Sequence, residues 1–263
     1  MGWSRSSRVG GGRWSTGLNA LTAAWRDAAT VGPSSGLLNA IDAYVVGSLA
    51  DGDLTGVDWL VICATEDEQQ ARINLMAPSK VGTCNGTFTA SQGWQGNSTD
   101  QSFAIGESVT AGGSYTQNSA MYALYCNLQT GSTGSAVQGG TSSGSLLRIQ
   151  PSSAGTGSFN INATTTTTWP TPGNALRSGF RMVVRPDASN QIGYLNGAQA
   201  ATAAVASTGT PAGGGGFLRF GSSTYGRDQI AAMMLGGAKD ASAAGRMHTR
   251  IHTLMTALGA AYP

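Results

Sequence analysis

The segment GFRMVVRPDASNQIGYLNGAQ, residues 179–199, decides the fold class. Its first half, FRMVVR (180–185), places apolar residues on one face of an extended chain and two arginines on the other, which is the two-residue period of a strand. A second apolar run ends in Asn196-Gly197, a pair that readily takes the positive φ angles of a tight hairpin turn. The segment therefore predicts neighbouring antiparallel strands.

The same type of pattern extends over residues 83–235, where short apolar or alternating runs are separated by turns of Gly, Asn, Ser and Pro. Many short strands with frequent turns are typical of a sandwich or jelly roll. Charged residues make up only 11% of the chain, against about 25% in ordinary soluble domains. We expect a mainly β protein, a concanavalin-A-like jelly-roll β-sandwich, over residues 37–263.

Helical patterns flank this β region. Apolar residues recur at steps of three and four from Leu37 to Leu49, which predicts a helix capped by Ser35 and ended by Gly52. The run 57–64 is apolar at nearly every position and predicts a buried strand. A capping-box pattern at Thr65–Glu68 predicts a second, short helix to about residue 75. The chain closes with an amphipathic helix over 241–258, with Asp240 near its cap.

Residues 1–36 differ from the rest, with three of the six tryptophans, four arginines and a run of three glycines. Tryptophans in such a leader have no core of their own, so we interpret it as an arm that docks on a neighbouring subunit. The alternative is that the arm folds back on its own domain. Tryptophan and arginine dominate interface energies, and the predicted anchoring residues are Trp3, Arg5, Arg8, Arg13, Trp14 and Trp25.

Charge and hydropathy argue against several partners. The net charge is only +2 and the basic residues are scattered, so no nucleic-acid partner is expected. No apolar run approaches the ~20 residues that span a bilayer, so no membrane partner is expected either. The sequence begins MGWSRSSRVGGGRW, which lacks a signal-peptide pattern. We therefore expect synthesis in a cytoplasm.

The candidate catalytic groups do not combine into a reaction centre. Glu66, Asp67 and Glu68 are adjacent, whereas a glycosidase needs two carboxylates that face each other. In the first turn of a helix they would instead complement its dipole. His248 and His252 share one helix without the glutamate of a zinc-protease motif. We predict a protein that is not an enzyme and has no metal or cofactor.

Sugar-binding sandwiches use aromatic faces together with planar amides and arginine. Residues of these types occur in the predicted strands and turns, although each also has a structural interpretation. The candidate glycan-binding residues are Trp94, Tyr122, Tyr194, Asn196, Tyr225 and Arg227.

The order of these elements resembles a group of tailed-phage virion proteins with a concanavalin-A-like or laminin-G-like domain. The resemblance lies in the segments LLNAIDAYVVGSLADGDLTGVDWLVICATEDEQQARINL, GTFTASQGWQGNSTDQS, GGSYTQNSAMYALYCN, GFRMVVRPDASNQIGYLNGAQ and FLRFGSSTYGRDQIAAMMLGGA, and in the closing helix. It covers about residues 37–260 and leaves the arm unmatched.

This resemblance implies a structural virion protein, made in the host cytoplasm, that presents a jelly roll in a tail fibre or tail tip for host adsorption. The alternatives are a capsid decoration or head-spike protein, and a module that binds or degrades host surface glycans. Other virion proteins would hold the arm, and a homo-oligomer is expected, with a trimer as one possibility.

Overall fold

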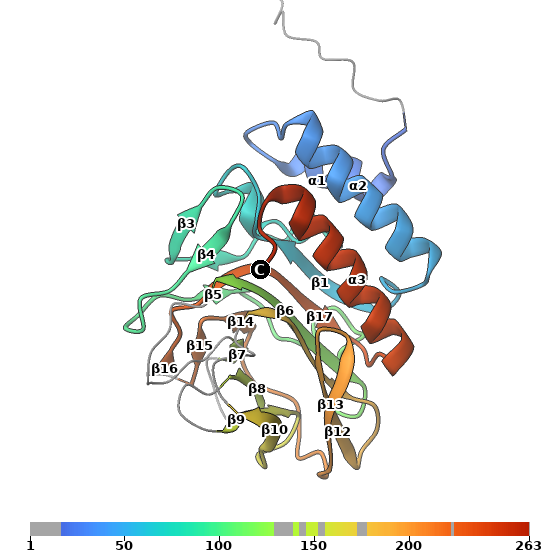
Figure 1. Cartoon of the computed structure of the whole chain (residues 1–263), viewed down its shortest axis with the longest axis vertical. Coiled ribbons are helices and arrows are strands. Elements are labelled where there is room, and N and C mark those ends of the chain that lie inside the picture. The colour runs from blue at the N-terminus through green and yellow to red at the C-terminus, as the bar shows by residue number, and fades with distance from the viewer. Residues whose placement is uncertain are drawn as a thin grey trace, which may run out of the picture.

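The computed structural model describes residues 17–128, 139–141, 146–151, 156–172, 178–221 and 224–262. Two antiparallel sheets pack face to face, and a layer of helices covers the outer side of the larger one (Figure 1). The larger sheet has the order β13-β12-β11-β6-β17-β4-β3, with β1 also paired to β17, and the smaller has the order β10-β9-β8-β7-β14-β5-β2. The predicted jelly-roll β-sandwich is confirmed.

The strands are mostly short. They are β1 (Val57–Ile62), β2 (Thr83–Cys84), β3 (Thr87–Thr89), β4 (Gly93–Gln95), β5 (Phe103–Ala104), β6 (Ala120–Leu128), β7 (Gly139–Thr141), β8 (Leu147–Gln150), β9 (Thr156–Ile161), β10 (Thr167–Pro172), β11 (Gly179–Arg185), β12 (Asn190–Leu195), β13 (Ala198–Ala204), β14 (Gly215–Phe217), β15 (Arg219–Phe220), β16 (Thr224–Tyr225) and β17 (Gln229–Gly236). The helices are α1 (Ala20–Ala28), α2 (Ser35–Ala50), the 3₁₀ turn η1 (Gln70–Arg72) and α3 (Ala241–Leu258).

Strand β11 shows how the larger sheet divides the core. It pairs with β6 on one side and β12 on the other, and successive side chains of a strand point to opposite faces. Phe180, Met182 and Val184 join the core beneath the helices, whereas Val183 joins the core between the sheets. The β12–β13 hairpin turns at Asn196 and Gly197, both with positive φ, as the Asn-Gly pair predicted.

The helix layer consists of α1, α2 and α3, with α2 in contact with both of the others. Helix α3 has the predicted bounds, and the Asp240 side chain accepts a hydrogen bond from the Ala243 N–H at 2.7 Å. Helix α2 is capped by Ser34, one residue before the predicted cap. Among the described residues, no helix combines the length and apolar character needed to cross a bilayer.

Two sequence predictions need correction. The arm was predicted to reach residue 36, but Ala20–Ala28 is a helix that packs on α2, and its Trp25 has no exposed surface. The side chain of Trp25 therefore belongs to the core beneath the helices and cannot anchor a partner. The helix predicted after Thr65 is only the 3₁₀ turn η1, because the Thr65 hydroxyl donates to the Asp67 carbonyl instead of capping a helix. The remaining predicted anchors lie outside the described residues: Trp3, Arg5, Arg8, Arg13 and Trp14.

Candidate functional site

Three of the predicted glycan-binding aromatics are buried. Trp94 and Tyr122 lie in the core between the sheets, and Tyr194 lies in the core beneath the helices. The Trp94 Nε1–H donates to the Ala71 carbonyl at 3.3 Å, and the Tyr122 hydroxyl donates to the Gly216 carbonyl. A ring enclosed on both faces cannot stack on a sugar, so these three residues stabilise the fold.

The other three predicted residues, Asn196, Tyr225 and Arg227, are partly exposed. Asn196 has a local role, because its Oδ1 accepts a hydrogen bond from the Phe180 N–H at 2.9 Å and it occupies the turn at φ 48°. Tyr225 ends β16, and Arg227 lies two residues beyond it. Asn196 therefore stabilises the hairpin turn, whereas Tyr225 and Arg227 lie together on one surface segment.

Around Tyr225 the structure forms a set that we call the arginine–aromatic patch: Arg148, Arg219, Phe220 and Tyr225, all partly exposed. The Arg219 guanidinium lies over the Tyr225 ring at 5.5 Å from the centroid, and that of Arg148 lies over Phe220 at 5.0 Å. Stacking on an aromatic face orients a planar guanidinium and its N–H donors. The patch therefore presents planar donors beside aromatic edges.

The backbone holds this patch against the smaller sheet. The Gly221 N–H donates to the Thr141 carbonyl of β7 at 2.9 Å, and the Arg219 Nε–H donates to the Gly221 carbonyl at 2.9 Å. A Cβ at Gly140 would lie 3.1 Å from the Phe220 ring, so glycine permits the close approach. Arg219, Phe220 and Tyr225 lie within the segment FLRFGSSTYGR, but the sequence does not reveal that Arg148 joins them from β8.

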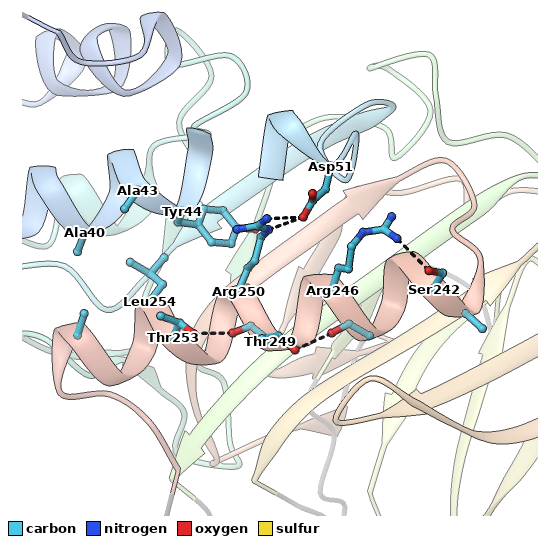
Figure 2. Close-up of a pocket in the computed structure, with 13 residues that line it drawn as sticks. Ala40, Ala43, Tyr44, Asp51, Ser242, Arg246, Thr249, Arg250, Thr253 and Leu254 are labelled. Atoms are coloured by element: carbon cyan, nitrogen blue, oxygen red, sulfur yellow. Dashed lines mark hydrogen bonds and ion pairs between the residues drawn. The ribbon is translucent and has the colours of Figure 1, made fainter. Parts of the chain in front are cut away.

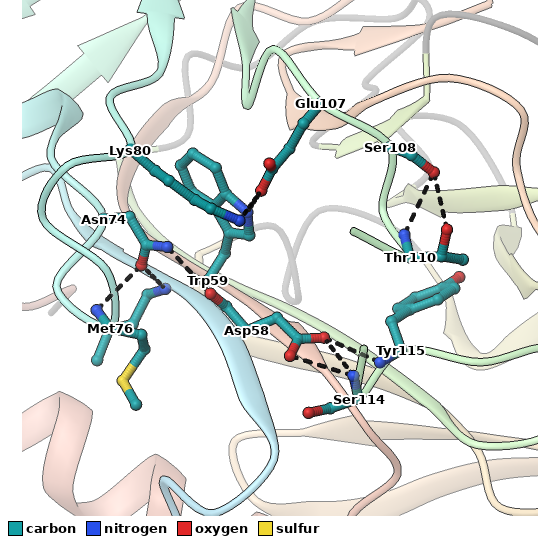
Figure 3. A network of polar contacts seen from close by, with 11 residues as sticks. Asp58, Trp59, Asn74, Met76, Lys80, Glu107, Ser108, Thr110, Ser114 and Tyr115 are labelled. Atoms are coloured by element: carbon teal, nitrogen blue, oxygen red, sulfur yellow. Dashed lines mark hydrogen bonds and ion pairs between the residues drawn. The ribbon is translucent and has the colours of Figure 1, made fainter. Parts of the chain in front are cut away.

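The acidic residues make structural contacts. Glu66 accepts hydrogen bonds from the backbone N–H and hydroxyl of Ser34, and Asp67 accepts one from the Gln69 N–H. In Figure 3, both carboxylate oxygens of Asp58 accept backbone hydrogen bonds from the loop 114–115. The nearby Glu107 accepts from the Trp59 Nε1–H at 2.7 Å and pairs with Lys80 at 2.8 Å. The contacts of Asp58 and Trp59 link β1 to loops of the sandwich.

The two histidines of α3 lie against the larger sheet. Either the Tyr125 hydroxyl or the His252 Nδ1 donates in the 2.7 Å hydrogen bond that joins them, and the rings of His248 and His252 are 5.8 Å apart. Burial, and then the neighbouring His252, lower the pKa of His248. Within the described part of the chain, no three His, Cys, Asp or Glu side chains are placed to hold a metal ion.

A groove of about 620 Å³ runs between α2 and α3 (Figure 2). Most of its lining is small or apolar, including Ala40, Ala43, Leu254 and Ala257. Two ion pairs lie toward one end. Arg250 Nε donates to Asp51 at 2.9 Å, and Arg246 Nη2 lies 2.8 Å from the Asp53 carboxylate. The Asp53 carboxylate in turn raises the pKa of Arg246.

The threonines that line this groove have internally satisfied hydroxyls. Thr249 Oγ1 donates to the Gly245 carbonyl and Thr253 Oγ1 to the Thr249 carbonyl, at 3.0 and 2.8 Å. A hydroxyl engaged with the preceding turn of its own helix is not directed at a ligand. The groove is therefore an apolar surface with neutralised charges at one end, and sequence periodicity alone did not reveal it.

These observations define a jelly-roll β-sandwich with helices on one face and an arginine–aromatic patch beside the smaller sheet. No known family profile matches the sequence, and no curated protein matches it. Among solved structures, the chain is similar to Trypanosoma rangeli sialidase in complex with the inhibitor DANA, with a TM-score of 0.54 and 10% identity, over 80% of this chain and 38% of that chain.

A mutant of the same sialidase that displays trans-sialidase activity gives a TM-score of 0.52 at 11% identity, over 82% of this chain and 39% of that chain. The chain thus spans well under half the length of the sialidase structures it matches. Similarity at this level of identity shows a shared fold.

Proposed function

We propose that this chain is a non-enzymatic carbohydrate-binding β-sandwich, carried at the surface of a tailed-phage particle for host adsorption. The observation that supports a sugar ligand best is the arginine–aromatic patch. Its two stacked guanidinium–ring pairs combine apolar faces with planar hydrogen-bond donors, the mixture that suits a sugar ring. The fold likeness to a sialidase solved with the inhibitor DANA agrees with this ligand class.

The glycan proposal is tested on an array of bacterial surface glycans with the full chain and matched tyrosine variants. Tyr225→Ala removes a ring of the patch, whereas Tyr262→Ala removes a partly exposed ring that packs on Tyr125, on the helix side. We expect Tyr225→Ala to abolish binding and Tyr262→Ala to retain it. Equal binding by both variants would place the ligand elsewhere. Failure of the full chain to bind any glycan on the array would refute the proposal.

The absence of catalysis is part of the same proposal. The acidic cluster at residues 66–68 is engaged in local contacts, with Glu68 also 3.8 Å from Arg72 in an ion pair. Incubation of the protein with any glycan bound on the array should release no new reducing ends. Release that survives purification would assign a polysaccharide-degrading activity instead.

The virion setting rests on the sequence resemblance over about residues 37–260. Residues Trp3, Arg5, Arg8, Arg13 and Trp14 are our candidates for attachment to a neighbouring virion protein. The triple variant Trp3→Ala, Arg5→Ala, Arg8→Ala should fold normally and be absent from purified particles, as judged by mass spectrometry. Incorporation at the normal level would refute attachment through these residues. Deleting residues 1–30 is a poorer test, because it removes Trp25 and α1 from the core.

A further inference from the structure

Charged residues are unevenly distributed along the chain. Between positions 108 and 227 of the sequence, Asp187 is the only acidic residue, whereas the same stretch holds six arginines: Arg148, Arg177, Arg181, Arg185, Arg219 and Arg227. This stretch forms every strand from β6 to β16, including most of the smaller sheet. All 13 Asp and Glu residues of the chain lie within the described residues, so each side-chain carboxylate that could neutralise an arginine is part of the described fold.

Two arginines of the arginine–aromatic patch have no acidic partner. Within the described residues, no ion pair joins a carboxylate to Arg148 or to Arg219. Asp187 is engaged in its own turn, where it accepts hydrogen bonds from the N–H groups of Ser189 and Asn190 at 2.7 and 2.8 Å. The positive charges of Arg148 and Arg219 are therefore not neutralised by the fold.

Arg148 is held in place although its charge is uncompensated. Its neighbours in β8, Leu147 and Ile149, lie in the core between the sheets, so the Arg148 side chain points to the outer face of the smaller sheet. Its guanidinium stacks on Phe220, and its Nε is buried without a hydrogen-bond partner in the described part of the chain. Burial lowers the pKa of Arg148, because desolvation opposes a charge that no anion offsets.

A guanidinium in this setting favours an anionic ligand. Its planar N–H donors match the oxygens of a carboxylate or phosphate group, and the Phe220 ring fixes the plane in advance. The Arg219–Tyr225 pair adds a second positive charge and a second aromatic ring on the same β15–β16 ribbon. A neutral sugar would leave both charges without a partner, whereas an acidic sugar would satisfy at least one of them.

We propose that the arginine–aromatic patch binds an acidic glycan, and that a carboxylate or phosphate group of this glycan pairs with the Arg148 guanidinium. The neighbouring rings would contact the apolar faces of the sugar, and the charge of Arg219 would attract the same ligand. This inference rests on the carbohydrate-binding function proposed above and narrows it to one chemical class.

The test compares each glycan that binds on the array with a neutral form of the same glycan. Carbodiimide and borohydride convert carboxylates to hydroxymethyl groups, and aqueous hydrofluoric acid removes phosphate substituents. The treatment that weakens binding therefore identifies the anionic group. Titration calorimetry measures the affinities of the full chain and two variants. Arg148→Met keeps an apolar stem over Phe220 without the charge, and Arg26→Met removes a positive charge from α1, where Arg26 pairs with Asp27.

We expect only acidic glycans to bind. Neutralisation of the glycan should weaken wild-type binding by about 10–100-fold, the range of a hydrogen bond to a charged group. Arg148→Met should lose a similar factor for the acidic form and bind the neutral form as the wild type does. Arg26→Met should match the wild type on both forms. The wild-type affinity for the acidic form should also fall as salt is added.

Several results would overturn this inference and leave the carbohydrate-binding function in place. They are tight binding of neutral glycans, an affinity for the acidic form that is independent of salt, and Arg148→Met affinities that equal the wild type or fall equally for both forms. An array on which the full chain binds nothing would instead refute both proposals. If circular dichroism shows that Arg148→Met does not fold, Arg148→Gln replaces it, and the measurements on the wild type need no variant.

Discussion

The two sides of β11 face cores of different chemistry. Toward the helices, Phe180 joins Met182, Met247 and other buried hydrophobic side chains. Between the sheets, Arg185 is fully buried beside the apolar residues. Its Nε–H donates to the Ile161 carbonyl at 2.7 Å and its Nη1 to the Val205 carbonyl at 2.9 Å.

This difference shows that the position of one strand can be held by apolar packing on one face and by hydrogen bonds of a buried arginine on the other. Apolar packing beneath the helices contributes stability in proportion to buried area, but it tolerates volume-conserving replacement. The Arg185 guanidinium instead satisfies carbonyls of two other segments, a contact that depends on geometry. Burial lowers the pKa of Arg185, which shows that desolvation opposes this charge. We infer that the helix side supplies more of the stability and the sandwich side more of the specificity.

The largest expected effect tests the helix side. Phe180→Ala removes a ring that is almost fully buried, and it should lower the free energy of unfolding by about 3–5 kcal/mol. The change is measured by urea denaturation, with Phe180→Leu as the volume-conserving control that should lose much less. Equal losses in the two variants would mean that the aromatic ring, and not its volume, is needed there.

A smaller loss is expected on the sandwich side. Arg185→Met keeps most of the side-chain length but leaves the carbonyls of Ile161 and Val205 without this donor. The cost should be about 2 kcal/mol, because a buried acceptor that loses its partner costs about 1–3 kcal/mol. Arg26→Met, at a partly exposed arginine of α1 that pairs with the exposed Asp27, should change stability little. An Arg185→Met protein more stable than the wild type would break the comparison, since the buried charge would then be a net cost.

The helix side should also respond to acid. The pKa of His248 is lowered in the fold by burial and then by His252, so the unfolded chain takes up the proton more readily. The free energy of unfolding should therefore fall as pH drops below the ordinary histidine pKa of about 6.5. Urea midpoints at neutral and mildly acidic pH measure this slope. His248→Gln should flatten it, whereas an unchanged slope would assign it to other groups.

The smallest effect is expected where β1 meets the loop after β5. Lys80→Met breaks the ion pair with Glu107, in which both side chains are about one-third exposed. It should cost less than about 1 kcal/mol, because Glu107 still accepts the hydrogen bond from Trp59. Urea denaturation at low and high salt measures the loss, and a cost that persists in high salt would point to packing by the lysine stem.

Sequence reasoning succeeded where a local period determines the structure. Helix α3 and the strand pair at residues 179–195 follow from spacing and capping within one segment. Helix α1 was missed because the glycines and arginines around it dominated the composition, although Asn19, Leu21 and Trp25 carry a cap and a helical spacing.

The environment of the aromatic side chains was harder to predict from the sequence. All but the last residue of β6 are buried, since both of its faces are covered. The sequence of β6 therefore shows no polar–apolar alternation. Without it, the sequence does not tell which face of the sheet Tyr122 occupies, or that both faces are shielded from solvent. The arginine–aromatic patch and the groove join residues far apart in the chain, and only the tertiary structure brings them together.

The helix layer joins the beginning of the described chain to its end. Strand β1 pairs with β17, and the Arg246–Asp53 contact links positions 193 residues apart. Contacts of such long range slow folding, because a large loop must close before they form. During synthesis, β1 and α2 must wait until β17 and α3 have left the ribosome. A chain interrupted late in translation would leave the apolar α2 uncovered and prone to aggregation.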